Sequence, residues 1–313
     1  MMDGGSRYND FASLLARKFP VKVQKLSVDA GMTCPNRDGS AGTGGCTYCN
    51  NRTFRPAYCC PEKSVRLQLE EGKRFFGRKY PRMQYLAYFQ AYTNTYGSLD
   101  ALRAVYEEAL AVDGVVGLVI GTRPDCMPDA LLDYLEELSG RTFLLVEYGI
   151  ESTSDATLRR VNRGHDYACT VDAVHRTAGR GIMTGGHVIL GLPGESREQI
   201  LAQAREISRL PLTTLKMHQL QLIRGTRMAE EYRTHPEDFR LCTADEYIDL
   251  VIDYVERLRP DLVLERFASQ SPKQLLIAPD WGLKNHELTD KVKRRMEERD
   301  SWQGKLFSVE SCD

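Results

Sequence analysis

Short apolar runs alternate along the chain with longer segments in which apolar residues recur at helical spacing. This alternation is typical of repeated βα units, which place their strands parallel in one sheet. The pattern predicts six strands, at residues 21–28, 84–89, 115–121, 142–150, 184–190 and 214–222. It predicts helices between and after these strands, at residues 64–76, 99–112, 128–138, 154–161, 167–179 and 198–208.

The pattern changes after residue 222. It predicts a long helix at 243–258 capped by Thr243, a last strand at 262–267 and a charged terminal helix at 284–299. Six consecutive βα units favour an α/β fold of the partial (β/α)6 barrel type, because right-handed crossovers return each strand to the same side of the sheet. A doubly wound open sheet is the alternative.

We expect three parts in the chain. Residues 1–20 form an N-terminal segment, residues 21–235 the partial barrel and residues 236–313 a C-terminal extension packed on it. The sequence contains neither an internal repeat nor a flexible Gly/Ser linker, which favours one continuous domain.

Composition describes an ordinary globular chain, with 42% hydrophobic and 27% charged residues among 313. The 42 basic and 43 acidic residues nearly cancel, so a nucleic acid partner would have to bind a local basic patch. No stretch has the 18 or so apolar residues that a membrane helix needs, and residues 1–10 lack the apolar run of a signal peptide. We expect a cytoplasmic protein that does not bind membranes.

Nine cysteines are many for a cytoplasmic chain, in which disulfides do not persist. Residues 31–50, directly after the first predicted strand, read GMTCPNRDGSAGTGGCTYCN and contain Cys34, Cys46 and Cys49. The carboxyl ends of parallel strands are where the active sites of such folds collect. Thiolates bind zinc and iron-sulfur clusters, and the glycines let the backbone wrap closely around a bound group.

The number of cysteines on this loop separates two kinds of site. A structural zinc site needs four ligands, whereas three thiolates on a four-iron cluster leave one iron open for another ligand. Cys59 or Cys60 could supply a fourth zinc ligand and make the loop part of a non-enzymatic, zinc-binding adaptor. Both alternatives stay open from the spacing alone.

The cysteine loop and several later segments together resemble the radical S-adenosylmethionine (SAM) enzymes of the bacterial YhcC/YtqA type, relatives of the catalytic subunit of Elongator. The resemblance extends from Val21 to about Pro279. Besides the Cys-x11-Cys-x2-Cys spacing, the segments that carry it are YLAYFQAYTNTY at 85–96, VIGTRPDC at 119–126, RVNRGHD at 160–166 and LGLPGE at 190–195.

The resemblance implies a barrel of the radical SAM type in which Cys34, Cys46 and Cys49 hold a 4Fe-4S cluster and SAM binds the open iron. It implies reductive cleavage of SAM to a 5′-deoxyadenosyl radical and modification of the side chain on a wobble uridine of tRNA. tRNA and an electron donor such as flavodoxin or ferredoxin are then the implied partners. Radical chemistry on a small molecule or a protein is the alternative.

Candidate SAM-binding residues lie where the predicted strands end. Gln90, Thr93 and Asn94 follow the second strand, in a segment that differs from the Gly-Gly-Glu sequence common in the superfamily. Glu151 ends the fourth strand and is the position at which the resemblance implies a contact to SAM. Arg160 and Arg163 come shortly after it, and either guanidinium could clamp the SAM carboxylate. A surface ion pair is the competing interpretation for Arg160.

Later strands supply further candidates. The backbone from Val188 to Gly191 could approach the adenine ring, and the residues after Gly191 exclude a Walker nucleotide loop. Lys216 and His218 fall on one face of the sixth strand and become catalytic, substrate-side residues if that face is the barrel interior. Cys126, after the third strand, is a candidate hydrogen donor or radical acceptor.

The C-terminal helix contains the basic residues that could form a local RNA-binding patch. A solvated helix face explains them equally well, because acidic residues alternate with them. The basic residues concerned are Lys284, Lys291, Lys293, Arg294, Arg295 and Arg299.

Overall fold

The protein is described by a computed structural model, which covers residues 6–77 and 82–308. In this part of the chain, seven parallel strands form one sheet in which each strand pairs with the next one along the sequence. The strands, in sheet order, are β1 (Val23–Val28), β2 (Gln84–Phe89), β3 (Val115–Thr122), β4 (Phe143–Glu151), β5 (Met183–Leu190), β6 (Thr214–Gln219) and β8 (Val263–Arg266).

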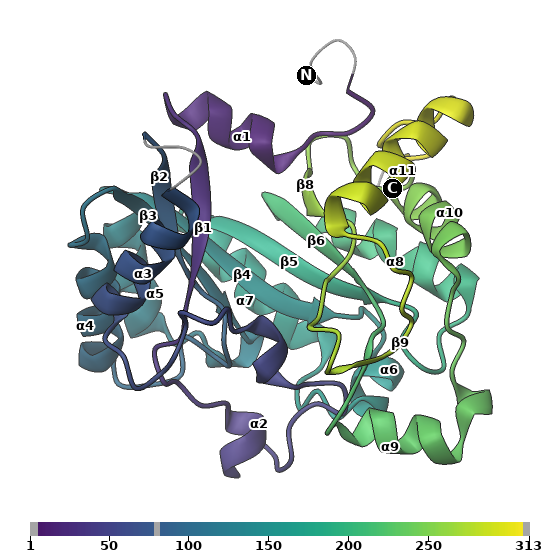
Figure 1. The fold of residues 1–313 in the computed structure, drawn as a ribbon, viewed down its shortest axis with the longest axis horizontal. Helices are drawn as coiled ribbons and strands as arrows, with labels where there is room; N and C mark the ends of the chain where they lie inside the picture. The colour runs from purple at the N-terminus through teal and green to yellow at the C-terminus, as the bar shows by residue number, and fades with distance from the viewer. Residues whose placement is uncertain (1–5, 78–81, 309–313) are drawn as a thin grey trace.

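The sheet curls into a half-barrel, and most of the helices cover its outer face (Figure 1). The helices are α1 (Phe11–Lys18), α2 (Pro35–Asp38), α3 (Val65–Gly77), α4 (Leu99–Leu110), α5 (Asp129–Ser139), α6 (Asp155–Arg160), α7 (Tyr167–Gly179), α8 (Arg197–Arg209), α9 (Arg227–Thr234), α10 (Ala244–Val255) and α11 (Asn285–Glu298). Short 3-10 helices are η1 (Asn51–Phe54), η2 (Pro124–Cys126) and η3 (Pro236–Asp238).

The strand order confirms the α/β partial barrel, because a doubly wound sheet would reverse its order partway. Two details differ from the prediction. The last strand, expected in the extension, is β8 and pairs parallel to β6 as a seventh strand of the sheet. The predicted strand at 214–222 is divided, because Leu222 and Ile223 leave the sheet as β7 and pair antiparallel with β9 (Leu276–Ala278).

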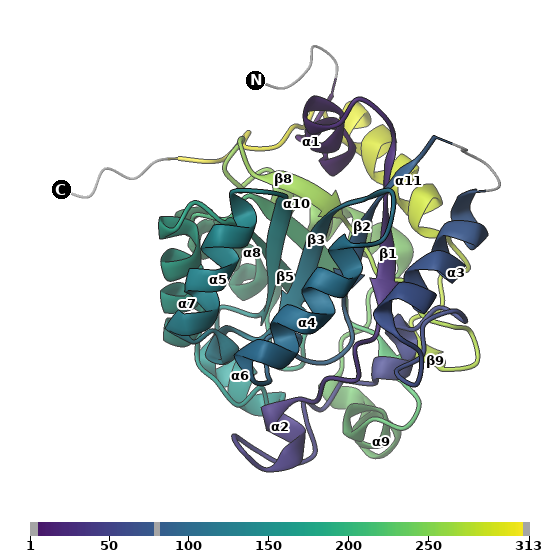
Figure 2. The same ribbon diagram turned by 90° about the vertical axis from the view of Figure 1, so that its left-hand side faces the viewer.

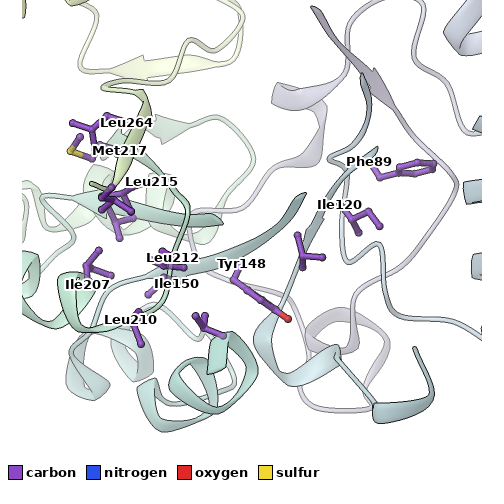
Figure 3. Close-up of a cluster of buried hydrophobic side chains, with 14 of the residues drawn as sticks. Phe89, Ile120, Tyr148, Ile150, Ile207, Leu210, Leu212, Leu215, Met217 and Leu264 are labelled. Atoms are coloured by element: carbon purple, nitrogen blue, oxygen red, sulfur yellow. The ribbon is translucent and has the colours of Figure 1, made fainter. Parts of the chain in front are cut away.

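The two faces of the sheet have different environments. Residues on the outer face, such as Phe89, Ile120 and Tyr148, pack with the helices in a buried apolar cluster (Figure 3). The inner face begins with a smaller apolar cluster that includes Leu145 of β4 and Phe11 of α1. α1 thus packs against the interior at one end of the barrel, and α2 and α9 lie at the opposite end (Figure 2).

Candidate active site

The cysteine loop follows the carboxyl end of β1, and its conformation depends on close backbone packing. Gly45 has a positive φ of 74°, which favours glycine, and a Cβ atom there would lie 2.8 Å from Nε of Arg37. The Gly45 amide donates a 2.8 Å hydrogen bond to the carbonyl of Asn36. The Asn162 side chain donates to the carbonyl of Gly45 at 2.8 Å, so the loop is fixed to the segment after α6.

The loop brings its three cysteines to the wall of one cavity of about 600 Å³, at Cys34, Cys46 and Cys49. Side-chain N–H groups approach two of the sulfurs. Asn36 Nδ2 lies 3.7 Å and Arg163 Nη1 3.5 Å from Cys46 Sγ. Asn51 Nδ2 lies 3.5 Å from Cys49 Sγ. N–H donors at this range stabilise negative charge on sulfur and adjust the potential of thiolate-bound clusters.

The thiols and their surroundings fit an iron-sulfur cluster. Burial, together with the neighbouring Cys46, raises the pKa of Cys49 to about 11, and the Arg37 guanidinium opposes this rise only in part. No group of three or more His, Cys, Asp or Glu side chains in residues 6–77 and 82–308 could hold a single metal ion. A 4Fe-4S cluster instead takes each thiolate on a separate iron, and three free thiols around one cavity suit it.

The two cysteines considered as a fourth zinc ligand have other partners. The buried Cys59 thiol contacts Oε1 of Gln68 at 3.3 Å, and the Cys60 thiol contacts the carboxylate of Glu62. Neither cysteine is among the residues that line the cavity. Their placement gives no support to a zinc knuckle.

The segment after β2 places two of its three predicted residues in the cavity wall. Gln90 and Thr93 line it, and the Thr93 hydroxyl is buried without a hydrogen-bond partner in the described structure. Asn94 does not line the cavity, because its amide donates to the carbonyl of Gly121 at 2.9 Å and joins the ends of β2 and β3. Tyr92, with a positive φ of 62°, also lines the cavity.

Glu151 and Arg163, two of the predicted SAM-binding residues, lie next to each other in the wall of the cavity that contains the cysteines. Glu151 has a positive φ of 67°, an uncommon conformation for a residue with a side chain and one that recurs at functional sites. Its carboxylate lies 3.8 Å from Arg163 Nη2, which also donates to the carbonyl of Gly149 at 2.6 Å. A Cβ at Gly149 would lie 2.6 Å from both side chains, so glycine leaves the space that they occupy.

Three other predicted residues do not face the cavity. Arg160 forms a surface ion pair with Glu231 of α9, in agreement with the competing interpretation. Val188 is 1% exposed and lies in the outer core, because alternate residues of a strand face opposite sides and Ile189 takes the inner position. Gly191, past the end of β5, lines a separate cavity of about 300 Å³.

Cys126 is also outside the cavity wall. Its thiol is 7% exposed on η2 and lies 3.8 Å from Oδ1 of Asp125. Burial and the Asp125 charge raise the pKa of Cys126 to about 12. Cys126 is not among the residues that line the cavity, so its expected role as a hydrogen donor or radical acceptor stays a prediction.

Lys216 and His218 do share the inner face of β6, and their surroundings differ. Lys216 is 3% exposed, and its Nζ lies 2.6 Å from Oε2 of Glu147, 3.0 Å from the Tyr88 hydroxyl and 3.2 Å from Oε1 of Glu265. Lys216 is thus part of a buried ion network, whereas His218 lines the cavity. A catalytic role for either residue stays a prediction.

Glu147 is the centre of that network. Oε1 of this 1% exposed carboxylate lies 2.8 Å from Lys25 Nζ, and Oε2 lies 2.9 Å from His187 Nε2. Burial opposes ionisation, but the charges of Lys216 and Lys25 outweigh it and hold the pKa of Glu147 well below its usual value. Glu147 therefore stays ionised at the floor of the cavity.

His218 connects the network to β8. Burial and the charge of Arg266 lower the pKa of His218 well below its usual value, so the ring is neutral at pH 7. Its Nε2 lies 3.1 Å from Nη2 of Arg266 and must accept that hydrogen, which places the ring proton on Nδ1, next to the Ser269 hydroxyl. The neutral ring therefore fixes the guanidinium of Arg266 at the cavity wall.

The sequence analysis missed Lys25, His187, Glu265 and Arg266 as parts of the site. All four lie in predicted strands, and His187, Glu265 and Arg266 are next to apolar residues there, whereas Lys25 shares its strand with other polar residues. A charged residue inside a buried strand must find a partner, so each of these positions already indicated an inward-facing polar site.

A parallel half-barrel with a three-cysteine loop after its first strand defines the radical SAM class of enzymes. The chain belongs to the radical SAM superfamily: the superfamily model matches residues 38–207, and the model of the radical SAM C-terminal domain matches residues 212–298. It is thus a radical SAM enzyme.

Two relatives match most of this chain and most of their own length, and a third matches a smaller part of both. It is 36% identical to the uncharacterised protein YtqA of Bacillus subtilis over 96% of this chain and 93% of YtqA. It is 35% identical to the protein YhcC of Escherichia coli over 87% of each chain. It is 26% identical to the tRNA uridine(34) acetyltransferase of Methanocaldococcus infernus over 59% of this chain and 34% of that protein.

A solved structure has the same fold. The Elp3 protein of Methanocaldococcus infernus superposes with a TM-score of 0.67 and 18% identity, covering 90% of this chain and 64% of that one. This chain therefore spans less than two thirds of that structure. None of its described helices is both long and apolar enough to cross a membrane.

Proposed function

We propose that this enzyme holds a 4Fe-4S cluster through Cys34, Cys46 and Cys49 and uses SAM to modify the wobble uridine of tRNA. The observation that carries the proposal is the convergence of three free thiols of one loop on a single cavity. The name of one relative, a tRNA uridine(34) acetyltransferase, supports the choice of substrate. A cluster bound there supplies the electron that cleaves SAM reductively, which yields a radical able to remove hydrogen from the substrate.

In this proposal, residues of the chain bind SAM and orient it. The Arg163 guanidinium donates a hydrogen bond to Cys46 and holds it in place, and it can also donate to a carboxylate of SAM beside Glu151. The unpartnered Thr93 hydroxyl and the Gln90 amide offer hydrogen bonds to the same ligand. The floor formed by Glu147 and its cations closes the cavity without adding an uncompensated charge. A reducing electron carrier and tRNA are the proposed partners, and a cytoplasmic location is part of the same proposal.

The cysteine assignment is tested by anaerobic reconstitution with iron and sulfide, followed by addition of dithionite and SAM. We expect about four irons and 5′-deoxyadenosine from the intact protein, and a loss of at least about 100-fold in 5′-deoxyadenosine for Cys46→Ala, because a lost cluster ligand removes the electron source. Cys60→Ala is the matched control, because Cys60 is close in sequence but outside the cavity. Equal losses in both variants, or one zinc and no iron, would contradict the assignment.

The substrate is tested in cells. In a strain that lacks this gene, mass spectrometry of total tRNA nucleosides is expected to show a precursor form of a wobble-uridine modification, which should disappear when the intact gene is restored. Restoration with the Cys46→Ala gene should leave the precursor in place. An unchanged nucleoside profile in the deletion strain would direct the search to a small-molecule or protein substrate instead.

A further inference from the structure

A second cavity, of about 510 Å³, lies beside the cysteine loop and shares wall residues with the main one, Cys49 and Tyr92 among them. Four arginines line it, and its wall contains no Asp or Glu among the described residues. We call these four side chains the arginine mouth: Arg37, Arg52, Arg55 and Arg224. The cavity of the arginine mouth adjoins the main cavity, with which it shares six wall residues, and Cys49 lines both.

One asparagine holds the backbone of two of these arginines. Asn50 Oδ1 accepts a hydrogen bond from the Arg52 amide at 3.1 Å, and Asn50 Nδ2 donates to the Arg224 carbonyl at 2.9 Å. The loop after β1 and the segment after β7 thus meet at Asn50. Neither Arg52 nor Arg224 forms an ion pair with a carboxylate in the described part of the chain, so both guanidinium groups can bind an external anion.

The other two arginines are fixed more firmly. Arg37 Nη2 donates to the carbonyl of Cys49 at 2.9 Å, and Arg55 pairs with the buried Asp29 at 2.5 Å. The Arg55 guanidinium also lies 5.7 Å from the centre of the Tyr92 ring. Guanidinium forks that match phosphate oxygens, next to an aromatic ring on which a base can stack, are the features with which proteins bind single-stranded RNA.

Two of the six basic residues expected to form a patch at the C-terminal helix are neutralised by carboxylates of α10. Arg295 pairs with Asp249 at 2.7 Å and Arg299 pairs with Asp253, so α11 uses these charges to pack on α10. A chain with a net charge of −1 attracts polyanions only where its cations are locally unopposed. Arg52 and Arg224 of the arginine mouth meet this condition, whereas the paired Arg295 and Arg299 do not.

We propose that the arginine mouth binds the phosphodiester backbone of a single-stranded RNA loop, while the base to be modified passes into the main cavity. This inference rests on the proposed tRNA function and adds the place at which the RNA is held. A phosphate chain, rather than an acidic protein, suits the mouth because the occupant must be narrow enough to enter a hollow that adjoins the main cavity.

Fluorescence anisotropy with a labelled, unmodified tRNA transcript tests the inference on the reconstituted full chain, at several salt concentrations. For Arg52→Gln/Arg224→Gln we expect affinity to fall by at least about tenfold. The slope of log affinity against log salt should become less steep by about 1.4, since each single-strand phosphate contact contributes about 0.7. The matched control is Arg233→Gln/Arg294→Gln, which removes two exposed, ion-paired arginines outside both cavities. Thermal midpoints of all proteins verify that they are folded.

The outcomes separate the inference from the proposed function. A loss of affinity and slope in the mouth variant alone supports the inference. If the intact protein binds tRNA and the mouth variant binds equally well, the inference is wrong and the proposed function stands. If the intact protein does not bind tRNA at any salt concentration, both are wrong. Unchanged tRNA binding with slower reduction by flavodoxin would assign the mouth to an acidic electron carrier and overturn the inference.

Discussion

A carboxylate as buried as Glu147 loses its hydration and is stable only when neighbouring groups compensate for that loss. Lys216, Lys25 and His187 provide the compensation from three different strands, each within 3 Å of a carboxylate oxygen. These contacts join β1, β4, β5 and β6 across the interior. The network is therefore both the floor of the candidate site and a link between strands that do not all pair directly.

Replacement of Lys216 with Met should leave Glu147 with too little positive charge. We expect the free energy of unfolding, measured in urea, to fall by about 3 kcal/mol at pH 8. The loss should be smaller at pH 6. Burial is the main cause of the lowered His187 pKa, and the Lys216 charge adds to it; without Lys216 that added effect disappears, and a protonated His187 can replace the missing cation. That stabilisation is present below the ordinary histidine pKa and is lost as the pH rises.

Arg160→Ala is the matched control, because it removes a cation from a surface ion pair with Glu231. Exposed pairs contribute about 0–1 kcal/mol, so this variant should unfold almost as the intact protein does at either pH. Equal destabilisation by the two substitutions, or a Lys216→Met loss that does not depend on pH, would contradict the role assigned to the network.

Individual residues of the site could be predicted from the sequence where spacing or chemistry determines position. The cysteine spacing on a loop after a strand placed all three thiols at one cavity. Lys216 and His218 were assigned correctly to one face, because strand residues alternate. Within the predicted adenine-contact segment from Val188 to Gly191, Ile189 lines the cavity, whereas the Val188 side chain lies in the outer core. Sequence periodicity in a strand buried on both faces does not say which face is the interior.

At the level of elements, local patterns predicted every βα unit of the sheet. The Thr243 cap of α10 is also confirmed. Its hydroxyl accepts a hydrogen bond from the Glu246 amide, and the Glu246 carboxylate accepts one from the Thr243 amide. What could not be predicted depends on distant partners. β7 leaves the sheet only because β9 pairs with it, and β8 is a barrel strand only because β6 offers a free edge. Neither pairing can be recognised from the residues that are close to β7 or β8 in the sequence.

Two helices of eight residues, α1 and α9, escaped prediction for a related reason. α1 is short, and its apolar residues are buried by packing against the barrel interior, where Phe11 packs with Leu145. α9 packs against β7, and the Met228 amide donates to the carbonyl of Thr47 in the cysteine loop at 2.9 Å. Helices of eight residues gain most of their stability from such tertiary contacts rather than from intrinsic propensity.

In the whole molecule, the two ends of the described chain meet. The fully buried Gln303 accepts a hydrogen bond from the Asn9 amide at 3.0 Å. Its Nε2 donates to the carbonyls of Arg259 and Leu262 at 2.8 and 2.7 Å. Beside it, Asp10 bridges to Leu264 of β8. One side-chain amide thus connects the segment before α1 to the last strand of the barrel.

Gln303→Leu should break this connection and leave buried backbone groups without partners. Since each unsatisfied buried group costs about 1–3 kcal/mol, we expect the free energy of unfolding to fall by about 2–4 kcal/mol. Hydrogen exchange at the Asn9 amide should accelerate. Trp302→Ala is the control from the neighbouring, partly exposed position, for which a change below about 1 kcal/mol is expected. A Gln303→Leu protein as stable as this control would show that the two ends do not depend on each other.

The agreement between strand order and chain order has a consequence for biosynthesis. During translation, each new strand emerges beside a neighbour that has already been made, so the sheet can grow one strand at a time. By contrast, the contact of Gln303 with Asn9 and the contact of Asp10 with β8 join residues from nearly opposite ends of the described chain. The cysteine loop is therefore synthesised long before the residues that complete the fold, so the three thiols of the proposed cluster site exist in the nascent chain while the barrel still lacks its final strand.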